Sequence, residues 1–349
     1  GTLSASTSVD NGNLSIAVPP ENLSAVLELL ADVVQNPLLS ELETERGIIR
    51  EEILEDLDED GQLVDDRGLV RLLAFPDHGL GRPITGPIEN LETFDLARVR
   101  SHFAKTYVAS GMVLTVAGAL DAERVEQEIA AAFSGVPAGS PLAFVPAAEQ
   151  SERRFRMMQS AGSNQTRLSI AFRAPGEHDP LEPAVEMLLR VIDDGMSTRL
   201  YHRLCDSLGL CYDAAASYEA YDETGLVEFG TETAHERAPR VLTEILSLAE
   251  ELASSGPNEL ELERARRRAR WQHEAMLDHA GDLGDFLALG ELRRVARTPH
   301  ERLEHLLAVS QADVREAAQR IFGGAGRSVV AVGRAKGAAL GKLERLALG

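Results

Sequence analysis

The sequence contains two related halves. DLARVRSHFAKTYVASGMVLTVAG (95–118) aligns with QADVREAAQRIFGGAGRSVVAVG (311–333), and Gly118 falls on Gly333, an offset of 215 residues. Each copy reads as a helix, a short turn and a strand of small and β-branched residues that ends in glycine. A period this long is not that of a solenoid, and it predicts a tandem duplication with two homologous domains.

The repeat also indicates domain boundaries. We expect a first domain over residues 1–136, a Gly/Pro/Ala-rich linker over 137–150 and a second domain over 151–349. Residues 152–208 of the second copy have no counterpart in the first copy. The first domain is therefore predicted to lack its opening strand and helices.

Strands are expected in adjacent pairs that are followed by runs of helices. This order favours α+β domains, each with a mixed or antiparallel sheet layered with helices, over a doubly wound parallel sheet. The alternation and the repeat predict strands near 2–7, 13–18, 111–118, 153–159, 166–173, 212–219, 225–233 and 327–333. Helices are expected over 20–35, 40–58, 62–75, 94–107, 121–134, 180–195, 197–208, 236–254, 257–278, 282–296 and 311–322.

The charge of the chain restricts its partners. A net charge of −21 argues against binding to a nucleic-acid backbone, which needs a basic surface. No apolar run reaches the length of a membrane span. Cys205 and Cys211 have no second pair, so neither a disulfide framework nor a cysteine zinc site is predicted. This cysteine usage favours a cytoplasmic location.

The segment ERGIIREE (45–52) is unusual for an amphipathic helix. Leu42, Ile49 and Ile53 mark an apolar stripe, and Glu45 and Glu52 fall in or beside that stripe. A half-buried carboxylate needs a partner that offsets its desolvation. The stripe alone leaves two partners open, a metal ion or an Arg or Lys side chain.

Other catalytic signatures are missing from the sequence. HERLEH (300–305) resembles a zinc helix, but its histidines are five residues apart and lie ~140° from a shared face. HEAMLDH (273–279) fails on the same ground. Neither H-E-x-x-H nor H-x-x-E-H occurs, and there is no G-x-S-x-G elbow and no phosphate-binding loop.

Four segments together resemble one family. They are the strand pair TLSASTSVDNGNLSIAVPPENL (2–23), the helix ERGIIREEI (45–53), the stretch FPDHGLGRPITGPIENLETF (75–94) and DDGMSTRLYHRLCDSLGLCYDAAASYEAYDETGLVEFG (193–230). In this order they resemble the insulinase, pitrilysin and mitochondrial-processing-peptidase family of zinc peptidases. The resemblance implies tandem LuxS-like metalloenzyme domains, the first of them truncated.

The resemblance also implies roles for individual residues. Glu52 corresponds to the glutamate that binds Zn²⁺, and Glu45 to a neighbouring carboxylate that orients the ligands. Tyr212 corresponds to a tyrosine that contacts the substrate or the developing oxyanion. The arginine that the family often carries seven residues earlier is replaced by Cys205, and Arg203 or Arg199 could substitute for it.

The resemblance implies a zinc-dependent metalloendopeptidase as the intact protein. The family's H-x-x-E-H helix would precede Gly1, so this chain by itself is expected to be inactive. Two alternatives stay open, a non-catalytic subunit of a heterodimeric peptidase of the same family and an acidic scaffold without peptidase chemistry.

The expected partners follow from the same reading. The substrate would be a peptide or a small protein that lies along the strand near 2–8, and the chain would form a homodimer or a heterodimer. The acidic run EEILEDLDED (51–60) is either a solvated helix end or a wall that attracts basic peptides.

Overall fold

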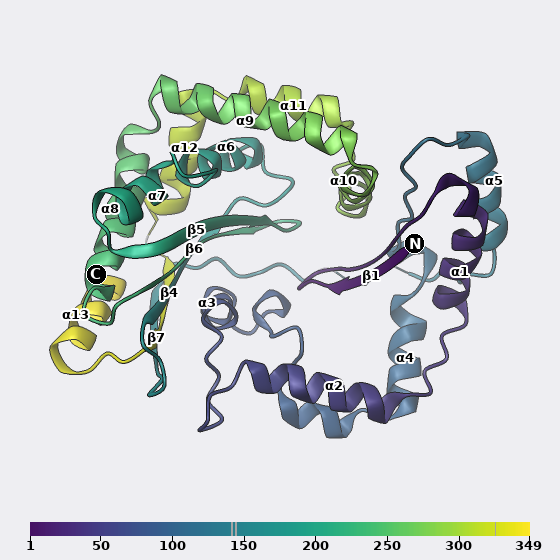
Figure 1. The fold of residues 1–349 in the computed structure, drawn as a ribbon, viewed down its shortest axis with the longest axis horizontal. Coiled ribbons are helices and arrows are strands. Elements are labelled where there is room, and N and C mark those ends of the chain that lie inside the picture. Colours follow the sequence, from purple (N-terminus) through teal and green to yellow (C-terminus); the bar gives the residue numbers. More distant parts are fainter. Residues whose placement is uncertain (141, 144, 325) are drawn as a thin grey trace. The chain divides into compact units, whose positions relative to one another are not determined.

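In a computed structural model that describes residues 1–140, 142–143, 145–324 and 326–349, the chain forms two units (Figure 1). Unit 1 consists of Gly1–Ile53, Ile84–Val145 and Glu274–Thr298. Unit 2 consists of Leu54–Pro83, Pro146–His273 and Pro299–Gly349. Neither unit is a single continuous stretch of the chain.

The two units contain segments from both predicted repeats. Leu54–Pro83 of the first repeat belongs to unit 2, and Glu274–Thr298 of the second repeat belongs to unit 1. The predicted offset places α3 (Asp66–Ala74) on residues 281–289, which lie inside α10 (Ala280–Leu292). The two repeats therefore exchange corresponding helices. The first repeat contributes α3 to unit 2, and the second repeat contributes α10 to unit 1.

Unit 1 is built on a β-hairpin. β1 pairs with β2 in antiparallel register, with Thr2 opposite Ala17, and Asn13 donates a hydrogen bond to Asp285 of α10 at 3.0 Å. The strands are β1 (Thr2–Thr7) and β2 (Gly12–Ala17), and the helices are α1 (Leu23–Gln35), α2 (Leu42–Glu55, which ends in unit 2), α4 (Leu96–Thr106), α5 (Ala122–Ala132) and α10. Short 3₁₀ turns are η1 (Pro20–Asn22), η3 (Ile88–Thr93) and η4 (Ala109–Gly111).

The strand predicted over 111–118 is wrong, because residues 112–117 are irregular chain. Its counterpart in the second repeat is β7 (Arg327–Gly333), which is hydrogen-bonded to a strand on each side. In the described part of unit 1, no strand flanks residues 111–118. A strand without a hydrogen-bonded neighbour leaves its backbone N–H and C=O groups unpaired. A strand-like sequence pattern is therefore not sufficient to form a strand at 111–118.

Unit 2 contains a five-stranded mixed sheet in the order β3-β7-β4-β6-β5, which confirms the α+β fold class. β3 and β7 run parallel, and the other neighbours are antiparallel. The remaining strands are β3 (Arg153–Gln159), β4 (Thr166–Ala174), β5 (Cys211–Ala220) and β6 (Gly225–Thr233). The helices are α3, η2 (Gly79–Gly81), α6 (Glu182–Ile192), α7 (Arg199–Tyr201), the π-helix η5 (His202–Ser207), α8 (Ala238–Ser255), α9 (Glu259–Asp278, which ends in unit 1), α11 (Pro299–Ala308), α12 (Gln311–Phe322) and α13 (Gly337–Leu348).

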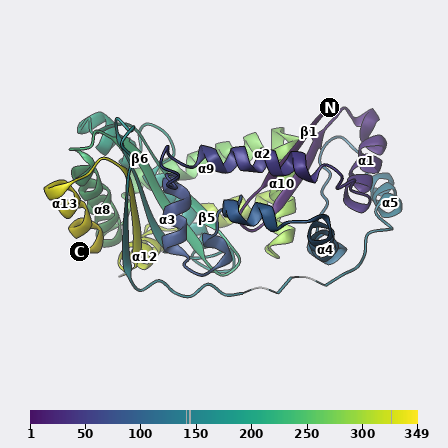
Figure 2. The ribbon, with the colours of Figure 1, turned by 90° about the horizontal axis from the view of Figure 1, so that it is seen from below.

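Alternation along β4 divides the sheet of unit 2 into two faces. Leu168, Ile170 and Phe172 are buried in the core that the sheet shares with α6, α8 and α12. On the opposite face, Ser169 donates a hydrogen bond to Asp66 of α3 at 2.6 Å. The sheet therefore lies between a helical layer and the single helix α3 (Figure 2).

No helix among the described residues combines the length and the apolar content that a bilayer crossing requires.

Candidate functional site

Helix α2 carries both predicted site glutamates. Glu45 and Glu52 are seven residues apart, which places them on nearly one face and ~10 Å apart along the helix axis. Both side chains are exposed, and so is Ile48 between them, at 55%. The expectation that these carboxylates are half-buried is wrong, because α2 buries Ile53 while its glutamate face stays open to solvent.

The arginines of α2 are paired with other groups. Arg46 forms an ion pair with Glu43 at 2.7 Å, and Arg50 forms one with Glu92. Within the part of the chain that the structure describes, neither Glu45 nor Glu52 has an ion pair or a side-chain hydrogen bond. A salt bridge is thus not what occupies these carboxylates, and both are free to bind another group.

The residues of this chain do not fit a zinc ion by themselves. A catalytic zinc site takes three protein ligands and a water molecule. Among the described residues, no three His, Cys, Asp or Glu side chains lie close enough together to hold a metal. The segments SELETERGIIREE (40–52) and NELELERARRRAR (258–270) also match, at an offset near 218, and place Arg270 opposite Glu52, so the second repeat has an arginine where the first has this carboxylate.

Tyr212 lies in an irregular part of β5 in unit 2. Cys211 is opposite Thr233 and Ala214 is opposite Thr231, so β5 has one more residue than β6 in this interval. This extra residue makes a β-bulge at Tyr212 and Asp213, and bulges change the direction of the side chains they carry. Tyr212 is 93% exposed, which makes its hydroxyl available to a ligand.

A cavity of about 510 Å³ adjoins Tyr212 within unit 2. It is lined by residues from the start of α3 and from three strands, namely Asp65, Asp66, Arg67, Gln165, Arg167, Tyr212, Asp213, Ala215, Gly230, Thr231 and Glu232. Asp65 caps α3 by accepting hydrogen bonds from two backbone N–H groups, and Asp66 pairs with Arg167. Asp213 and Glu232 are exposed and have no ion pair among the described residues, so the β5–β6 side of the cavity is acidic.

Sequence reasoning missed Asp213, Glu232 and the start of α3 as parts of one site. The alternation along β6 puts Gly230 and Glu232 on the same face, and this signal was available. The packing of α3 on that face could not be predicted from the sequence, because it depends on the exchange of segments between the repeats.

The arginines that could replace the family arginine are already bound. Arg199 donates to both carboxylate oxygens of Glu261 at 2.7 Å, and Arg203 forms an ion pair with Glu251 at 2.5 Å. These pairs hold α7 and η5 against α9 and α8. Neither guanidinium is therefore free to reach a ligand beside Tyr212.

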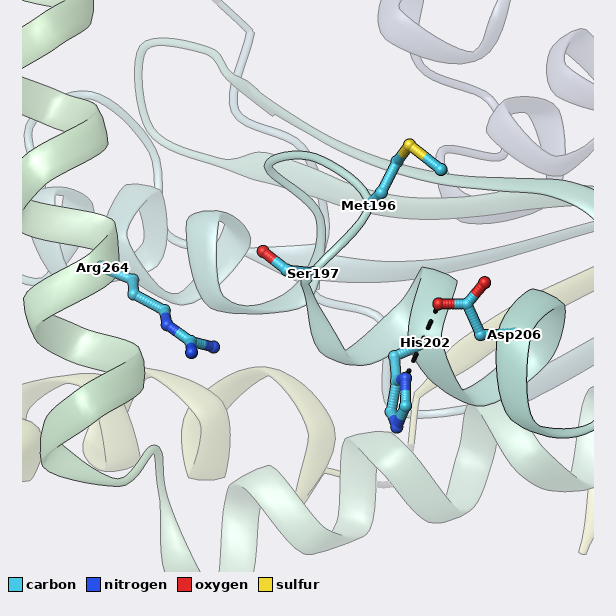
Figure 3. A pocket seen from close by; sticks show the side chains of 5 residues that line it. All are labelled: Met196, Ser197, His202, Asp206 and Arg264. Atoms are coloured by element: carbon cyan, nitrogen blue, oxygen red, sulfur yellow. Dashed lines mark ion pairs between the residues drawn. The ribbon is translucent and has the colours of Figure 1, made fainter.

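A second cavity of about 420 Å³ lies between the 196–197 loop, η5 and α9 (Figure 3). His202 Nδ1 is 3.7 Å from Asp206 Oδ2, and Arg264 extends from α9 on the other side. The side chains of His202 and Asp206 are both more than half exposed, so water screens their interaction. This arrangement offers no shielded environment for acid–base chemistry.

Glu228 of β6 is buried beneath α3, with 8% of its surface exposed. Burial raises its pKa to about 7, although Arg67 and Arg71 oppose the shift. The folded state therefore binds more protons than the unfolded state between the ordinary pKa of 4.5 and 7. The contribution of Glu228 to stability is most favourable at low pH and decreases as the pH rises through this window.

Substitution Glu228→Gln should raise the free energy of unfolding by about 1–3 kcal/mol above pH 7 and have little effect near pH 4. Urea denaturation across this pH range measures the difference. The exposed Glu232 on the same strand provides the control, since E232Q should change stability by less than about 0.5 kcal/mol at every pH. Equal stabilisation by E228Q at pH 4 and pH 8 would contradict the assigned titration.

Two family models match the chain. Residues 1–88 match "Insulinase (Peptidase family M16)", and residues 93–269 match "Peptidase M16 inactive domain". An uncharacterized zinc protease of Rickettsia bellii is 27% identical over 319 residues, which cover 89% of this chain and 75% of the relative. The mitochondrial-processing peptidase subunit beta of Dictyostelium discoideum is 24% identical over 353 residues, which cover 95% and 73%.

Solved structures share the fold. A protease from Helicobacter pylori superposes with a TM-score of 0.86 at 16% identity, covering 95% of this chain and 82% of that one. A peptidase M16 inactive domain from Pseudomonas fluorescens gives a TM-score of 0.83 at 17% identity, covering 96% and 81%. At these identities the similarity establishes the architecture alone.

Proposed function

We propose that this chain, which belongs to the insulinase family of peptidases (peptidase family M16), binds the peptide substrate and supplies one zinc ligand in a zinc endopeptidase. The main support for this proposal is the environment of the Glu52 carboxylate. This carboxylate is exposed and has no ion pair within the described chain, and it lies on the helix that the family reading assigns to the third zinc ligand.

The roles on α2 differ between the two glutamates. Glu52 supplies one ligand, and Glu45, two turns away, orients other ligands rather than binding the metal itself. The remaining ligands are histidines of an H-x-x-E-H motif, which the 349 residues do not contain. This chain alone is therefore proposed to be inactive, and the intact protein or a partner supplies the histidines.

Each unit offers a surface to an extended peptide. All six residues of β1 are exposed, and among the described residues β1 pairs only with β2. Its open edge suits a peptide that binds as an added strand. In unit 2, the exposed Tyr212 hydroxyl on the bulge would donate a hydrogen bond to a peptide carbonyl or to a developing oxyanion.

The charge of the protein supports a preference for basic peptides. The net charge is −21, and Asp213 and Glu232, which have no ion pair among the described residues, line the cavity beside Tyr212. Clefts with one sign of charge raise the local concentration of ligands of the opposite sign. We further propose that the working form is a dimer, in which a second two-unit chain encloses the bound peptide.

Peptide binding can be tested on this chain directly. Fluorescence anisotropy with two labelled peptides of equal length, one lysine-rich and one glutamate-rich, should show tighter binding of the basic peptide, and the difference should shrink at high salt. Equal binding of both peptides would remove the charge preference. Binding of neither would favour the acidic-scaffold alternative.

We would assay enzyme activity on the protein expressed from its complete reading frame. We expect this protein to contain close to one zinc per chain and to cleave the basic peptide.

A second candidate function is a non-catalytic subunit of a heterodimeric peptidase, which the match of residues 93–269 to an inactive domain favours. A protein without zinc that binds peptide but does not cleave it would support this second function.

Substitution Tyr212→Phe should weaken peptide binding about 3–10-fold, the effect of one lost hydrogen bond of about 1 kcal/mol. The same anisotropy titration measures it. Tyr107 is also exposed but stacks on Phe103 in unit 1, so Y107F is the matched control and should leave the affinity unchanged. An unchanged affinity in Y212F would exclude the hydroxyl contact.

A further inference from the structure

Two thiols lie side by side in unit 2. The Sγ atoms of Cys205 in η5 and Cys211 in β5 are 3.7 Å apart, and both residues are partly buried against the core. A disulfide bond brings two sulfur atoms to about 2.0 Å. The thiols therefore need only a small movement of the two side chains to react with each other.

The chain between the two cysteines is already folded back on itself. The N–H of Leu210 donates to the carbonyl of Leu204 at 2.8 Å, and the N–H of Gly209 donates to the carbonyl of Cys205 at 3.2 Å. Gly209 makes the turn with a φ of 55°, in the left-handed region that glycine enters without strain. Because the fold closes this loop, pairing of the thiols costs little additional conformational entropy.

Both cysteines also belong to irregular backbone. Cys205 lies in a π-helix, a form that is rare and is found frequently at functional sites. Cys211 is the first residue of β5 and directly precedes the bulge that carries Tyr212. A bond between these residues would join the π-helix to the irregular end of β5.

We propose that Cys205 and Cys211 form a reversible disulfide that ties η5 to β5 and fixes the bulge at Tyr212. The formation of this bond goes beyond the proposed peptidase function and does not depend on it. The oxidant is a small-molecule disulfide, RSSR. The two thiols lose two protons and two electrons, and RSSR is reduced to two RSH.

The pairing takes two exchange steps. One of the two thiols loses its proton, attacks RSSR and expels one thiolate, which takes up a proton. The other thiol then loses its proton, attacks the protein sulfur of the mixed disulfide and expels the second thiolate, which is protonated in turn. Burial, followed by the contact with Cys211, raises the pKa of Cys205, which keeps this thiol protonated and slows the exchange.

The bond can be detected by peptide mapping of the whole chain. Cleavage after Arg203 and Arg237 releases residues 204–237, which contain both cysteines. After oxidised glutathione and alkylation, we expect this peptide to carry no alkyl group and to be lighter by two hydrogen atoms. C205S and C211S remove one partner each, so neither variant should form the intramolecular bond with oxidised glutathione.

Hydrogen exchange tests the structural consequence. In the oxidised protein, amides of residues 202–214 should exchange at least about tenfold more slowly than in the reduced protein. The double variant C205S/C211S should show no change with oxidant. Two alkylated thiols after oxidation, or disulfides only between chains, would overturn the pairing. An intramolecular disulfide without slower exchange would overturn its effect on the bulge.

Discussion

Replacing Glu52 with glutamine is expected to remove the zinc and the peptidase activity that we propose for the protein expressed from its complete reading frame. The amide keeps the size of the side chain but loses the charge that a zinc ligand provides. Loss of an outer partner of a metal site already costs 10–100-fold in metal affinity or activity. We therefore expect E52Q to lower kcat/KM more than about 100-fold, with zinc content measured by mass spectrometry falling in parallel.

Neighbouring glutamates on α2 provide internal controls. Glu51 is exposed like Glu52 but is rotated ~100° around the helix, so E51Q should keep full activity and zinc. Glu45 lies on the glutamate face two turns earlier, and E45Q should fall between the two, about 10–100-fold below the unsubstituted protein. If E52Q and E51Q retain equal zinc, Glu52 is not a ligand, and the family-based assignment of this site fails.

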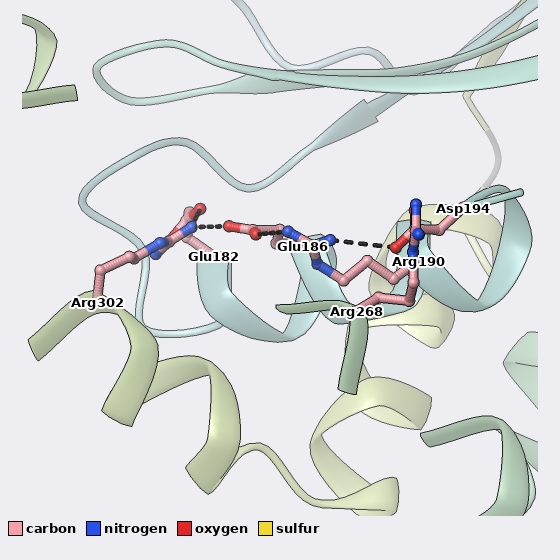
Figure 4. A network of polar contacts seen from close by, with 6 residues as sticks. All are labelled: Glu182, Glu186, Arg190, Asp194, Arg268 and Arg302. Atoms are coloured by element: carbon pink, nitrogen blue, oxygen red, sulfur yellow. Dashed lines mark hydrogen bonds and ion pairs between the residues drawn. The ribbon is translucent and has the colours of Figure 1, made fainter. Parts of the chain in front are cut away.

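Replacing Arg302 with alanine is expected to destabilise unit 2 by about 3–5 kcal/mol. Arg302 of α11 donates to both carboxylate oxygens of Glu182, at 2.5 and 2.7 Å, and also pairs with Glu186 (Figure 4). Glu182 is only 3% exposed, and burial raises its pKa even with Arg302 in place. Without the guanidinium, Glu182 would be a buried charge with no cation that offsets its desolvation.

The same network contains a matched control. It continues along α6 from Glu186 through Arg190 to Asp194, which pairs with Arg268 of α9 at 2.9 Å. The Arg268 side chain is 48% exposed, and Asp194 keeps Arg190 as a partner, so R268A should cost less than about 1 kcal/mol. Urea denaturation of the two variants measures the contrast.

A second substitution distinguishes lost charge pairing from lost packing. If the uncompensated Glu182 charge causes the effect, E182Q combined with R302A should recover part of the lost stability, because the amide needs no cation. Similar small losses for R302A and R268A would show that the buried end of the network is no more important than its exposed end.

Much of the fold follows from local sequence. The alternation along residues 166–174 determines which side chains of β4 enter the core, and the predicted strands of the second domain match β3 to β7 closely. The family and the position of Glu52 on a helix were also accessible, since they depend on residue order and helical spacing. These features need no knowledge of what lies opposite each element.

Only the tertiary structure decided the features that depend on a neighbouring segment. A strand needs a partner, so residues 112–117 stay irregular although their repeat counterpart is β7. Three other features also depend on a neighbouring segment. They are the exposure of Glu45 and Glu52, the packing of α3 in unit 2 and the approach of Cys205 to Cys211. Periodicity specifies the faces of an element, whereas burial and contact depend on what packs against each face, and that is set by the path of the whole chain.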